Sequence, residues 1–188
     1  KALDETLAIA QELGLHTQNH EYYVGTIDIN DKDTNLGILG HVDIVPEGAN
    51  WSFDPYGATI VDGKMYGRGT SDDKGPVIAA LFALAAVKQL NIPLKYNTKL
   101  IVGTDEESDW RCVDTYFKHE EMPTLGFAPD ADFPIIFAEK GIWDFYIKQA
   151  PNLETITAEV TVKEFTSGRR FNMVPDYAKA VLDVKDSQ

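Results

Sequence analysis

The start of the chain alternates apolar and polar positions with the period of an α-helix. Its apolar residues recur every three or four positions: Leu3, Leu7, Ala10 and Leu13. This spacing predicts a helix over residues 1–15, and Gly14 is a typical residue to end it. Apolar stretches over residues 21–29 and 36–45, on either side of a polar turn, predict two strands.

The middle of the chain alternates predicted strands and helices. Residues 75–90 are apolar nearly all round, which predicts a buried helix, and Pro76 suits its first turn. Residues 98–104 form an apolar run, typical of a strand covered on both faces in a largely parallel sheet. A helix over residues 109–121 and one or two strands over residues 134–148 continue the pattern. These alternations predict an α/β layered domain.

Two other segments carry signals of antiparallel structure. Asp62-Gly63 is a favoured dipeptide for a two-residue hairpin turn. Residues 156–184 differ from the rest, because polar and apolar residues alternate there between turn signals. This pattern predicts an antiparallel module at the end of the chain.

Composition and charge exclude several classes of protein. The 188 residues carry a net charge of -13, which repels nucleic acid and anionic membranes. No apolar run approaches the roughly 20 residues of a membrane span, and the amino terminus lacks a signal-peptide pattern. Cys112 is the only cysteine, so a disulfide framework is excluded and a cytoplasmic location is expected.

Two polar clusters stand out in the first half of the chain. In GHVDIVP, alternation along a strand would point His41 and Asp43 the same way, as in a metal-bound imidazole held by a carboxylate. The alternative is an ordinary hydrogen-bonded histidine. In YGRGTSDDKGP, Asp72 and Asp73 precede the predicted apolar helix, where either could cap its first turn.

Two more clusters follow apolar strands in the second half. LIVGTDEESDW ends on Asp105, Glu106 and Glu107, which a solvated loop or a bound cation would explain. GFAPDADFP places Asp130 and Asp132 after a proline, where a turn is the simple explanation. Each cluster by itself favours its structural explanation.

Together the four clusters predict a site for two neighbouring divalent ions. Functional sites of open α/β sheets gather at the carboxyl ends of strands, where these clusters are expected. A pair of metals needs a bridging carboxylate, terminal ligands and a base for the attacking water. His41, Asp72, Glu107 and Asp130 could supply the ligands and Glu106 the base, although the sequence alone does not say which of the two glutamates is which.

The motifs resemble the co-catalytic zinc peptidases, a family that includes carboxypeptidase G, the aminoacylases and the PepV-type dipeptidases. The resemblance covers residues 40–141, through GHVDIVPEGANWSFDPYGATIVDGKMYGRGTSDDKGP, VGTDEES and PDADFPIIFAEKG. It is strongest to the PepV-like dipeptidases, in DDKGP and PDADFP. It implies a three-layer αβα catalytic domain with a largely parallel mixed sheet, a dipeptide or short peptide as substrate, and two Zn²⁺ ions, with Mn²⁺ or Co²⁺ as substitutes.

The resemblance also implies a role for each residue of the site. His41 and Asp130 would bind one ion, Asp43 would orient His41, and Asp72 would bridge both ions. The resemblance also implies a cis peptide bond between Asp72 and Asp73. Only the resemblance separates the two glutamates, with Glu106 as general base and Glu107 as ligand. In this reading the metals offset the repulsion among the carboxylates.

One departure from the family concerns a second histidine ligand, which the family needs far downstream. The other histidines of this chain, His16, His20 and His119, occupy no such place, and His119 is expected to be solvated. Residues 1–141 are expected to form the first part of the catalytic domain, and residues 142–188 the start of an α+β lid domain. The chain is therefore expected to be incomplete and to have little peptidase activity by itself.

Two alternatives to a dipeptidase stay open on the sequence. An N-acyl amino acid deacylase would use the same metals, because substrate choice depends on other segments. A non-catalytic homologue would keep the fold but could lose the base, and Glu106 is present. The oligomeric state is not predicted by any pattern in the chain.

Overall fold

The chain divides into two compact units, Lys1–Ile136 and Phe137–Gln188. The structure, a computed structural model, describes residues 1–132, 134–148, 159–170 and 174–185. Within these ranges no helix is long and apolar enough to cross a membrane. The first unit contains the α/β domain, and the second contains a two-stranded sheet.

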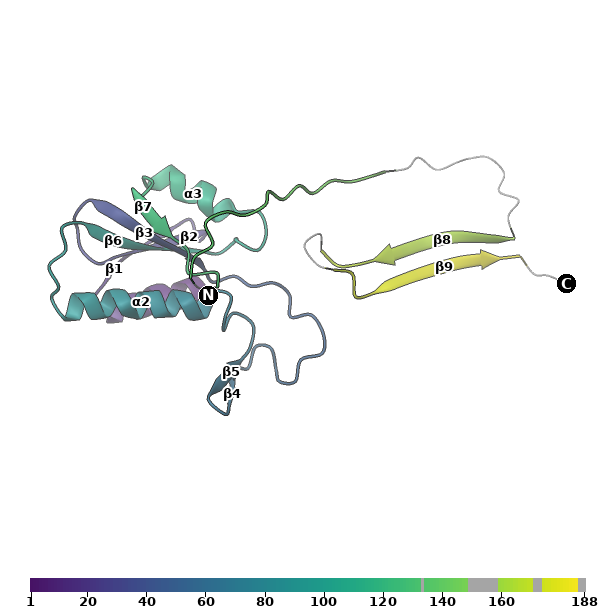
Figure 1. Ribbon diagram of the computed structural model, residues 1–188, viewed down its shortest axis with the longest axis horizontal. Helices are drawn as coiled ribbons and strands as arrows, with labels where there is room; N and C mark the ends of the chain where they lie inside the picture. Colours follow the sequence, from purple (N-terminus) through teal and green to yellow (C-terminus); the bar gives the residue numbers. More distant parts are fainter. Residues whose placement is uncertain (133, 149–158, 171–173, 186–188) are drawn as a thin grey trace. The chain divides into compact units, whose positions relative to one another are not determined.

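The first unit is built around a five-stranded mixed sheet with the strand order β1-β2-β6-β3-β7 (Figure 1). Its strands are β1 His16–His20, β2 Val24–Asp28, β3 Thr34–His41, β6 Asn97–Gly103 and β7 Leu125–Phe127. Strands β3, β6 and β7 run parallel, whereas β1 and β2 add an antiparallel edge. The sheet is therefore mixed, with the parallel pairs in the half that carries the predicted metal ligands.

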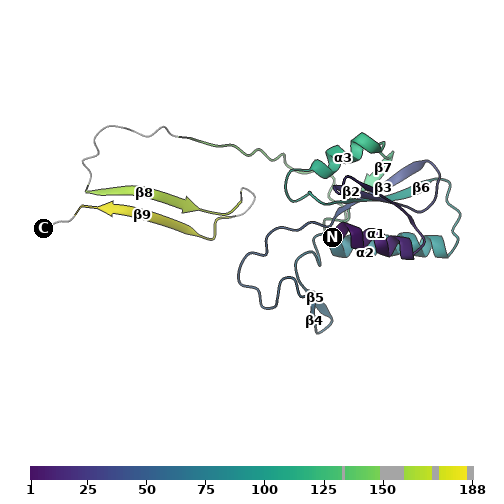
Figure 2. The same ribbon diagram turned by 180° about the vertical axis from the view of Figure 1, so that it is seen from behind.

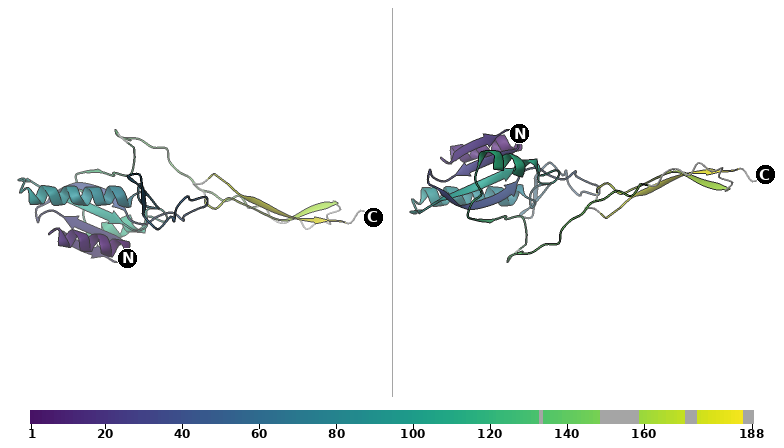
Figure 3. Two further views of the ribbon diagram at one scale, coloured as in Figure 1. Left: turned by 90° about the horizontal axis from the view of Figure 1, so that it is seen from below. Right: turned by 90° about the horizontal axis from the view of Figure 1, so that it is seen from above.

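Helices cover both faces of the sheet, as the three-layer prediction requires. Helices α1 Ala2–Glu12 and α2 Lys74–Gln89 lie side by side on one face, and α3 Arg111–His119 packs on the other (Figures 2 and 3). The main core joins α1 and α2 to the sheet through buried residues such as Leu7, Leu81 and Leu100. Gly14 follows α1 with a φ of +78°, so the predicted end of that helix is confirmed.

The prediction that the second helix is buried nearly all round is wrong. Val77, Leu81 and Leu84 of α2 are buried against the sheet, but the neighbouring Phe82 is 52% exposed. A helix in an outer layer of a three-layer domain buries only the stripe that faces the sheet. The apolar composition of α2 therefore indicates a strong core contact together with an uncovered outer face.

The predicted hairpin at Asp62-Gly63 is confirmed. Strands β4 Thr59–Val61 and β5 Lys64–Tyr66 pair antiparallel across it. Both turn residues have positive φ values, 49° and 75°, which a two-residue turn of the primed type requires.

Strand predictions are wrong in two places. Residues 134–148, all described, contain no strand, and the short strand β7 lies before them at Leu125–Phe127. The strand predicted over residues 36–45 ends at His41. A strand needs a hydrogen-bonded neighbour as well as a suitable sequence, and the pairing of β3 with β6 stops at His41 and Gly103.

The antiparallel module predicted for the tail is confirmed in the second unit. Strands β8 Val160–Ser167 and β9 Ala178–Val184 pair antiparallel with a register irregularity between Val162 and Glu164. Part of the predicted range, residues 156–158 and 171–173, lies outside the described residues.

A charged pair anchors the start of α3. The Arg111 guanidinium donates two hydrogen bonds to Asp105, with Nε 2.7 Å from Oδ2 and Nη2 2.8 Å from Oδ1. The backbone N–H of Arg111 donates a third bond to the same carboxylate, at 3.0 Å. These hydrogen bonds hold the pKa of Asp105 below its usual value, although burial opposes them.

We expect Leu81→Ala to destabilise the first unit far more than Phe82→Ala. Leu81 is fully buried between α2 and the sheet, so truncation leaves a cavity and costs about 2–5 kcal/mol. Phe82 is its exposed neighbour on the same helix and serves as the control, with an expected change within about 1 kcal/mol. Denaturant unfolding followed by circular dichroism measures both, and equal losses would contradict the assigned packing.

We expect Asp105→Asn to make stability less sensitive to acid. Because the folded pKa of Asp105 lies below the unfolded value of about 3.9, ionised Asp105 stabilises the fold above that pH. This contribution disappears as the pH falls through the folded pKa. The melting temperature of the metal-free protein should therefore fall less steeply in the variant between about pH 5 and pH 3. Asp109→Asn, at an exposed neighbour, is the control, and parallel curves for all three proteins would contradict the prediction.

Candidate metal centre

The predicted site residues meet at the carboxyl ends of the three parallel strands. His41 is the last residue of β3, Glu106 and Glu107 follow β6, and Asp130 follows β7. Asp72 comes from the loop that leads into α2. Parallel pairing brings the first three segments to one edge of the sheet, which is the usual location of sites in such folds.

The His41 imidazole lies at the centre of this group. The residue is 2% exposed, and its Nε2 lies 3.1 Å from Asp72 Oδ1 and 3.4 Å from Asp130 Oδ2. Glu106 Oε2 is slightly farther, at 3.8 Å. Yet Nε2 makes no hydrogen bond within the part of the chain that the structure describes. A buried imidazole nitrogen among several carboxylate oxygens is the arrangement that a divalent cation fits.

Asp43 holds the other side of the ring and the loop after β6. His41 Nδ1 lies 3.4 Å from Asp43 Oδ1 and 3.1 Å from the Asp43 carbonyl oxygen. The Asp43 carboxylate also accepts the backbone N–H groups of Glu106 and Glu107, at 3.2 Å and 3.0 Å. The expected proximity of His41 and Asp43 is confirmed, but strand alternation is not its cause because β3 ends at His41. A carboxylate behind a ligand imidazole fixes the orientation of the ring.

Two overlapping groups of side chains could each hold an ion. One group is His41, Asp72 and Glu107, and the other is His41, Asp73 and Asp130. Within each group, one candidate ligand atom per residue lies within 4.8 Å of the others. All four expected ligands are therefore brought together, and Asp73 is an additional carboxylate that the sequence did not single out as a ligand.

The electrostatics of the group favour cation binding. Burial lowers the pKa of His41, but the hydrogen bond that its ring donates to Asp43 and the charges of Asp43, Glu106 and Asp130 outweigh it and raise that pKa to about 9. Burial is also the main cause that raises the pKa of Glu106 and of Asp130, and neighbouring carboxylates add to it. A bound cation would replace the imidazole proton and stabilise the carboxylates, so the donor set fits a divalent metal.

Only part of the acidic run after β6 belongs to the group. Asp105 points away into its pair with Arg111, whereas Glu106 and Glu107 face the site. The expectation that metals offset this whole run therefore needs a correction for Asp105, since a guanidinium already neutralises it. No local sequence pattern indicated this pair, because Asp105 and Arg111 lie six residues apart, outside the three- and four-residue spacings at which charged side chains pair on a helix.

The helix-cap explanation of the Asp72-Asp73 pair is wrong for Asp73. The Asp72–Asp73 peptide bond is cis, as the family resemblance implied. Asp73 occupies the N-cap position of α2 but makes no side-chain capping bond to that helix, which the structure describes throughout. Its Oδ2 instead accepts the backbone N–H of His41, at 3.0 Å. Sequence alone cannot separate these two uses of a carboxylate before a helix.

Lys74 is a second residue near the site that the sequence analysis did not single out. Its ammonium lies against Gly69, where an added Cβ would come within 2.3 Å of Nζ. Burial lowers the pKa of Lys74, and the charges of Asp43 and Asp72 oppose that effect. The missing side chain at Gly69 thus leaves room for the Lys74 ammonium near the carboxylates of Asp43 and Asp72.

The remaining histidines lie away from the group. His16 and His20 belong to the edge strand β1. The expectation that His119 is solvated is confirmed, since the residue is exposed. Its ring also stacks on His20 at 5.1 Å, and its Nε2 lies 2.9 Å from Glu21 Oε1. All four histidines are described, and His41 alone contributes an imidazole to the predicted centre.

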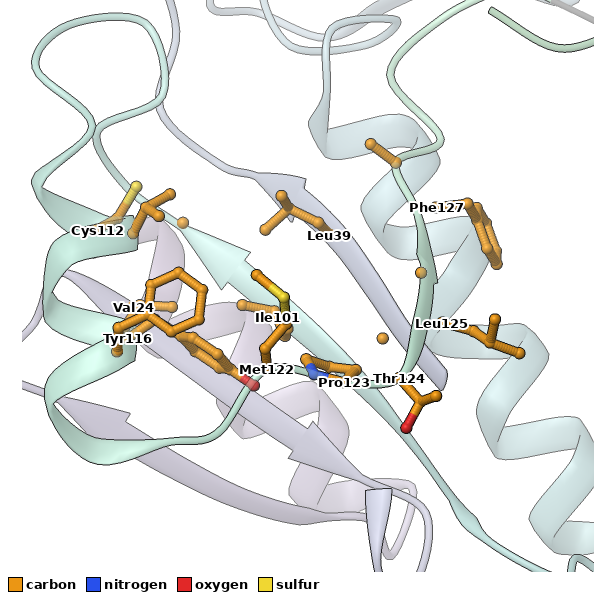
Figure 4. Close-up of a pocket in the computed structure, with 16 residues that line it drawn as sticks. Val24, Leu39, Ile101, Cys112, Tyr116, Met122, Pro123, Thr124, Leu125 and Phe127 are labelled. Carbon is orange, nitrogen blue, oxygen red and sulfur yellow. The ribbon is translucent and has the colours of Figure 1, made fainter. Parts of the chain in front are cut away.

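An apolar groove lies beside α3 and is separate from the predicted chemistry. Figure 4 shows side chains such as Leu39, Ile101, Met122 and Phe127 around it. Its lining carries no carboxylate or imidazole, and burial raises the pKa of its thiol, Cys112, and of its phenol, Tyr116, which keeps both protonated near neutral pH. The candidate reaction centre is therefore the polar group around His41.

Comparison with known proteins identifies relatives along almost the whole chain. YtjP of Bacillus subtilis (strain 168), which carries a dipeptidase name, is 50% identical over 184 residues, 97% of this chain and 39% of the relative. A protein of Staphylococcus haemolyticus with the same kind of name is 44% identical over 188 residues, 100% of this chain and 40% of the relative. The chain therefore spans about two fifths of the length of these relatives.

Solved structures share the fold at low sequence identity. Aminopeptidase PepT from Bacillus cereus is 15% identical and matches with a TM-score of 0.52, over 96% of this chain and 59% of that one. A tripeptidase from Staphylococcus aureus is 21% identical, with a TM-score of 0.50 over 69% of this chain and 36% of that one. The model of Peptidase family M20/M25/M40 matches residues 37–186, which include every predicted site residue. The chain thus belongs to the M20/M25/M40 family of metallopeptidases.

Proposed function

We propose that the full-length protein hydrolyses dipeptides or short peptides with the help of two divalent cations, most simply zinc. The observation that carries this proposal is the buried His41 Nε2, which has carboxylate oxygens at 3.1–3.8 Å and no hydrogen-bond partner among the described residues. Membership of the peptidase family supports peptide hydrolysis, and the names of the relatives support a dipeptide substrate.

We assign the ligands as the family resemblance implies them, and each assigned ligand belongs to one of the two groups of side chains around His41. His41 and Asp130 would hold one ion and Glu107 the other, and Asp72 would contribute to both. Support comes from the closeness of Asp72 to both His41 and Glu107. When bound, two such cations lower the pKa of a water molecule and polarise the peptide carbonyl.

Glu106 is the proposed general base. Its carboxylate borders the site and is about one-third exposed, so both a water molecule and a peptide can reach it. Its raised pKa suits a group that takes a proton from the attacking water and then gives it to the leaving amine. Asp43 keeps the Glu106 backbone and the His41 ring in register, because it accepts the Glu106 N–H and lies beside Nδ1.

The assignments outside the site are also proposals. Residues 142–188 begin a lid domain, and the antiparallel pair β8–β9 supports a separate module there. The protein acts in the cytoplasm, and the buried, unpaired Cys112 supports a reducing compartment.

We expect Glu106→Gln to lower kcat of the full-length enzyme on a dipeptide by about 10²–10⁴-fold, because the amide cannot accept the proton of the attacking water. KM and the bound zinc, measured by elemental analysis, should change little because Glu106 is not assigned as a ligand. Glu5→Gln, on the exposed side of α1, is the control. Unchanged turnover in the Glu106 variant would refute the assignment of the base.

The same assay decides the substrate class. A dipeptide and an N-acyl amino acid of matched side chain are given to the zinc-loaded wild-type protein at equal concentration. Faster turnover of the dipeptide is expected. Faster turnover of the acyl compound would identify a deacylase, and hydrolysis of neither compound would contradict catalysis at this centre.

We expect the 188-residue polypeptide by itself to hydrolyse dipeptides at least about tenfold more slowly than the full-length protein, because the loss even of residues that only support a metal ligand typically costs about 10–100-fold in activity. The reason is the single imidazole of its metal centre, His41, among side chains that are all described. Parallel assays at equal concentration and saturating zinc measure the ratio. Equal rates would show that the residues of this chain complete the centre.

A further inference from the structure

We propose that Asp73 is a positioning residue of the metal centre, whose carboxylate fastens the start of α2 to the end of β3. The inference rests on the proposed function, because it concerns the same pair of ions. It adds a role for a residue that is neither an assigned ligand nor the assigned base.

The first observation is the hydrogen bond that the Asp73 carboxylate accepts from the backbone of β3. Asp73 is fully buried, and its Oδ2 accepts a hydrogen bond from the backbone N–H of His41, which lies 32 residues earlier in the chain. It stands at the N-cap of α2, where an aspartate ordinarily accepts N–H groups of the first helical turn. The carboxylate bonds β3 instead, so the local cap is given up for a contact between two segments.

The second observation is the space that β3 leaves for this contact. Gly40 precedes His41, and a Cβ added at Gly40 would lie 2.6 Å from Asp73 Oδ2 and 2.5 Å from Val77 Cγ2. Both distances are shorter than real Cβ contacts, so a side chain at Gly40 would displace the carboxylate or the helix. The glycine therefore permits the close approach of α2 to the end of β3.

The consequence concerns the two assigned ligands on either side of this contact. The bond from the His41 backbone to Asp73 fixes the position of Asp72, which is the adjacent residue, relative to the His41 ring. The result is the 3.1 Å approach of Asp72 Oδ1 to His41 Nε2. Metal sites tolerate displacements of only about 0.5 Å, so a residue that locks two ligand-bearing segments together raises metal affinity.

Two substitutions separate this role from helix capping. In Asp73→Asn the amide oxygen can still accept the His41 N–H. In Asp73→Ser the hydroxyl is a favoured N-cap but is too short to span to β3. Calorimetric titration of the metal-free, full-length proteins with Zn²⁺ gives affinity and stoichiometry, and dipeptide turnover is followed in parallel.

The expected pattern is specific to positioning. Zinc affinity should fall about 10–100-fold in Asp73→Ser, with both ions still bound at high zinc, and less than about tenfold in Asp73→Asn. Wild-type affinity in Asp73→Ser would overturn the inference, since capping would then be sufficient. An Asn variant that binds one ion fewer would also overturn it, because Asp73 would then be a ligand.

A second pair of variants covers a failure of Asp73→Ser to fold, which melting of the metal-free protein would reveal. Gly40→Ala is made in a Val77→Ala background, so that the added methyl group meets only the Asp73 carboxylate, and Val77→Ala alone is the control. Zinc affinity about tenfold weaker than in the control supports the inference, and equal affinity overturns it. If the wild-type protein binds zinc and hydrolyses the dipeptide while these variants match their controls, only the positioning role of Asp73 is refuted. If the wild-type protein binds no zinc, the proposed function is refuted together with the positioning role.

Discussion

The parallel ladder between β3 and β6 is the constraint on which the predicted centre depends. Its register places His41 opposite Gly103, so both strands end at the same level of the sheet. The chain then leaves the sheet on both sides, carrying Asp43 from one strand and Glu106 from the other to the same point. A shift of this register by one residue would turn His41 to the other face and separate it from the carboxylates.

The acidic residues at the carboxyl ends of the parallel strands lie in two different electrostatic environments. Asp105 is neutralised by Arg111, and that pair also fixes the start of α3. The carboxylates of Glu106 and Asp130 lie against the His41 imidazole instead, and burial, with a contribution from neighbouring carboxylates, raises the pKa of both. The distinction explains why a chain with a net charge of -13 can end a core strand on three acidic residues. One residue is structural, and the other two belong to the candidate site.

The sequence predicted much of the fold because helix and strand periods leave clear patterns. The helix before Gly14, the hairpin at Asp62-Gly63 and the antiparallel tail all follow local rules. Predictions based on hydrophobicity alone were less accurate. Residues 134–148 have strand-like composition without a pairing partner, and the apolar helix α2 has one face uncovered. Pairing and burial both depend on segments that are distant in sequence.

The sequence by itself determined which polar clusters are available, and together with the family resemblance it predicted His41, Asp72, Glu107 and Asp130 as ligands of a metal site. Spacing reports which chemical groups are available and where strands end. Only the tertiary structure decided how each carboxylate is used. Asp73 has the sequence context of a helix cap and binds the backbone of His41, and Asp105 has the context of a metal ligand and binds Arg111. Local sequence cannot distinguish these uses, because a carboxylate accepts whichever donor the folded chain brings within hydrogen-bonding distance.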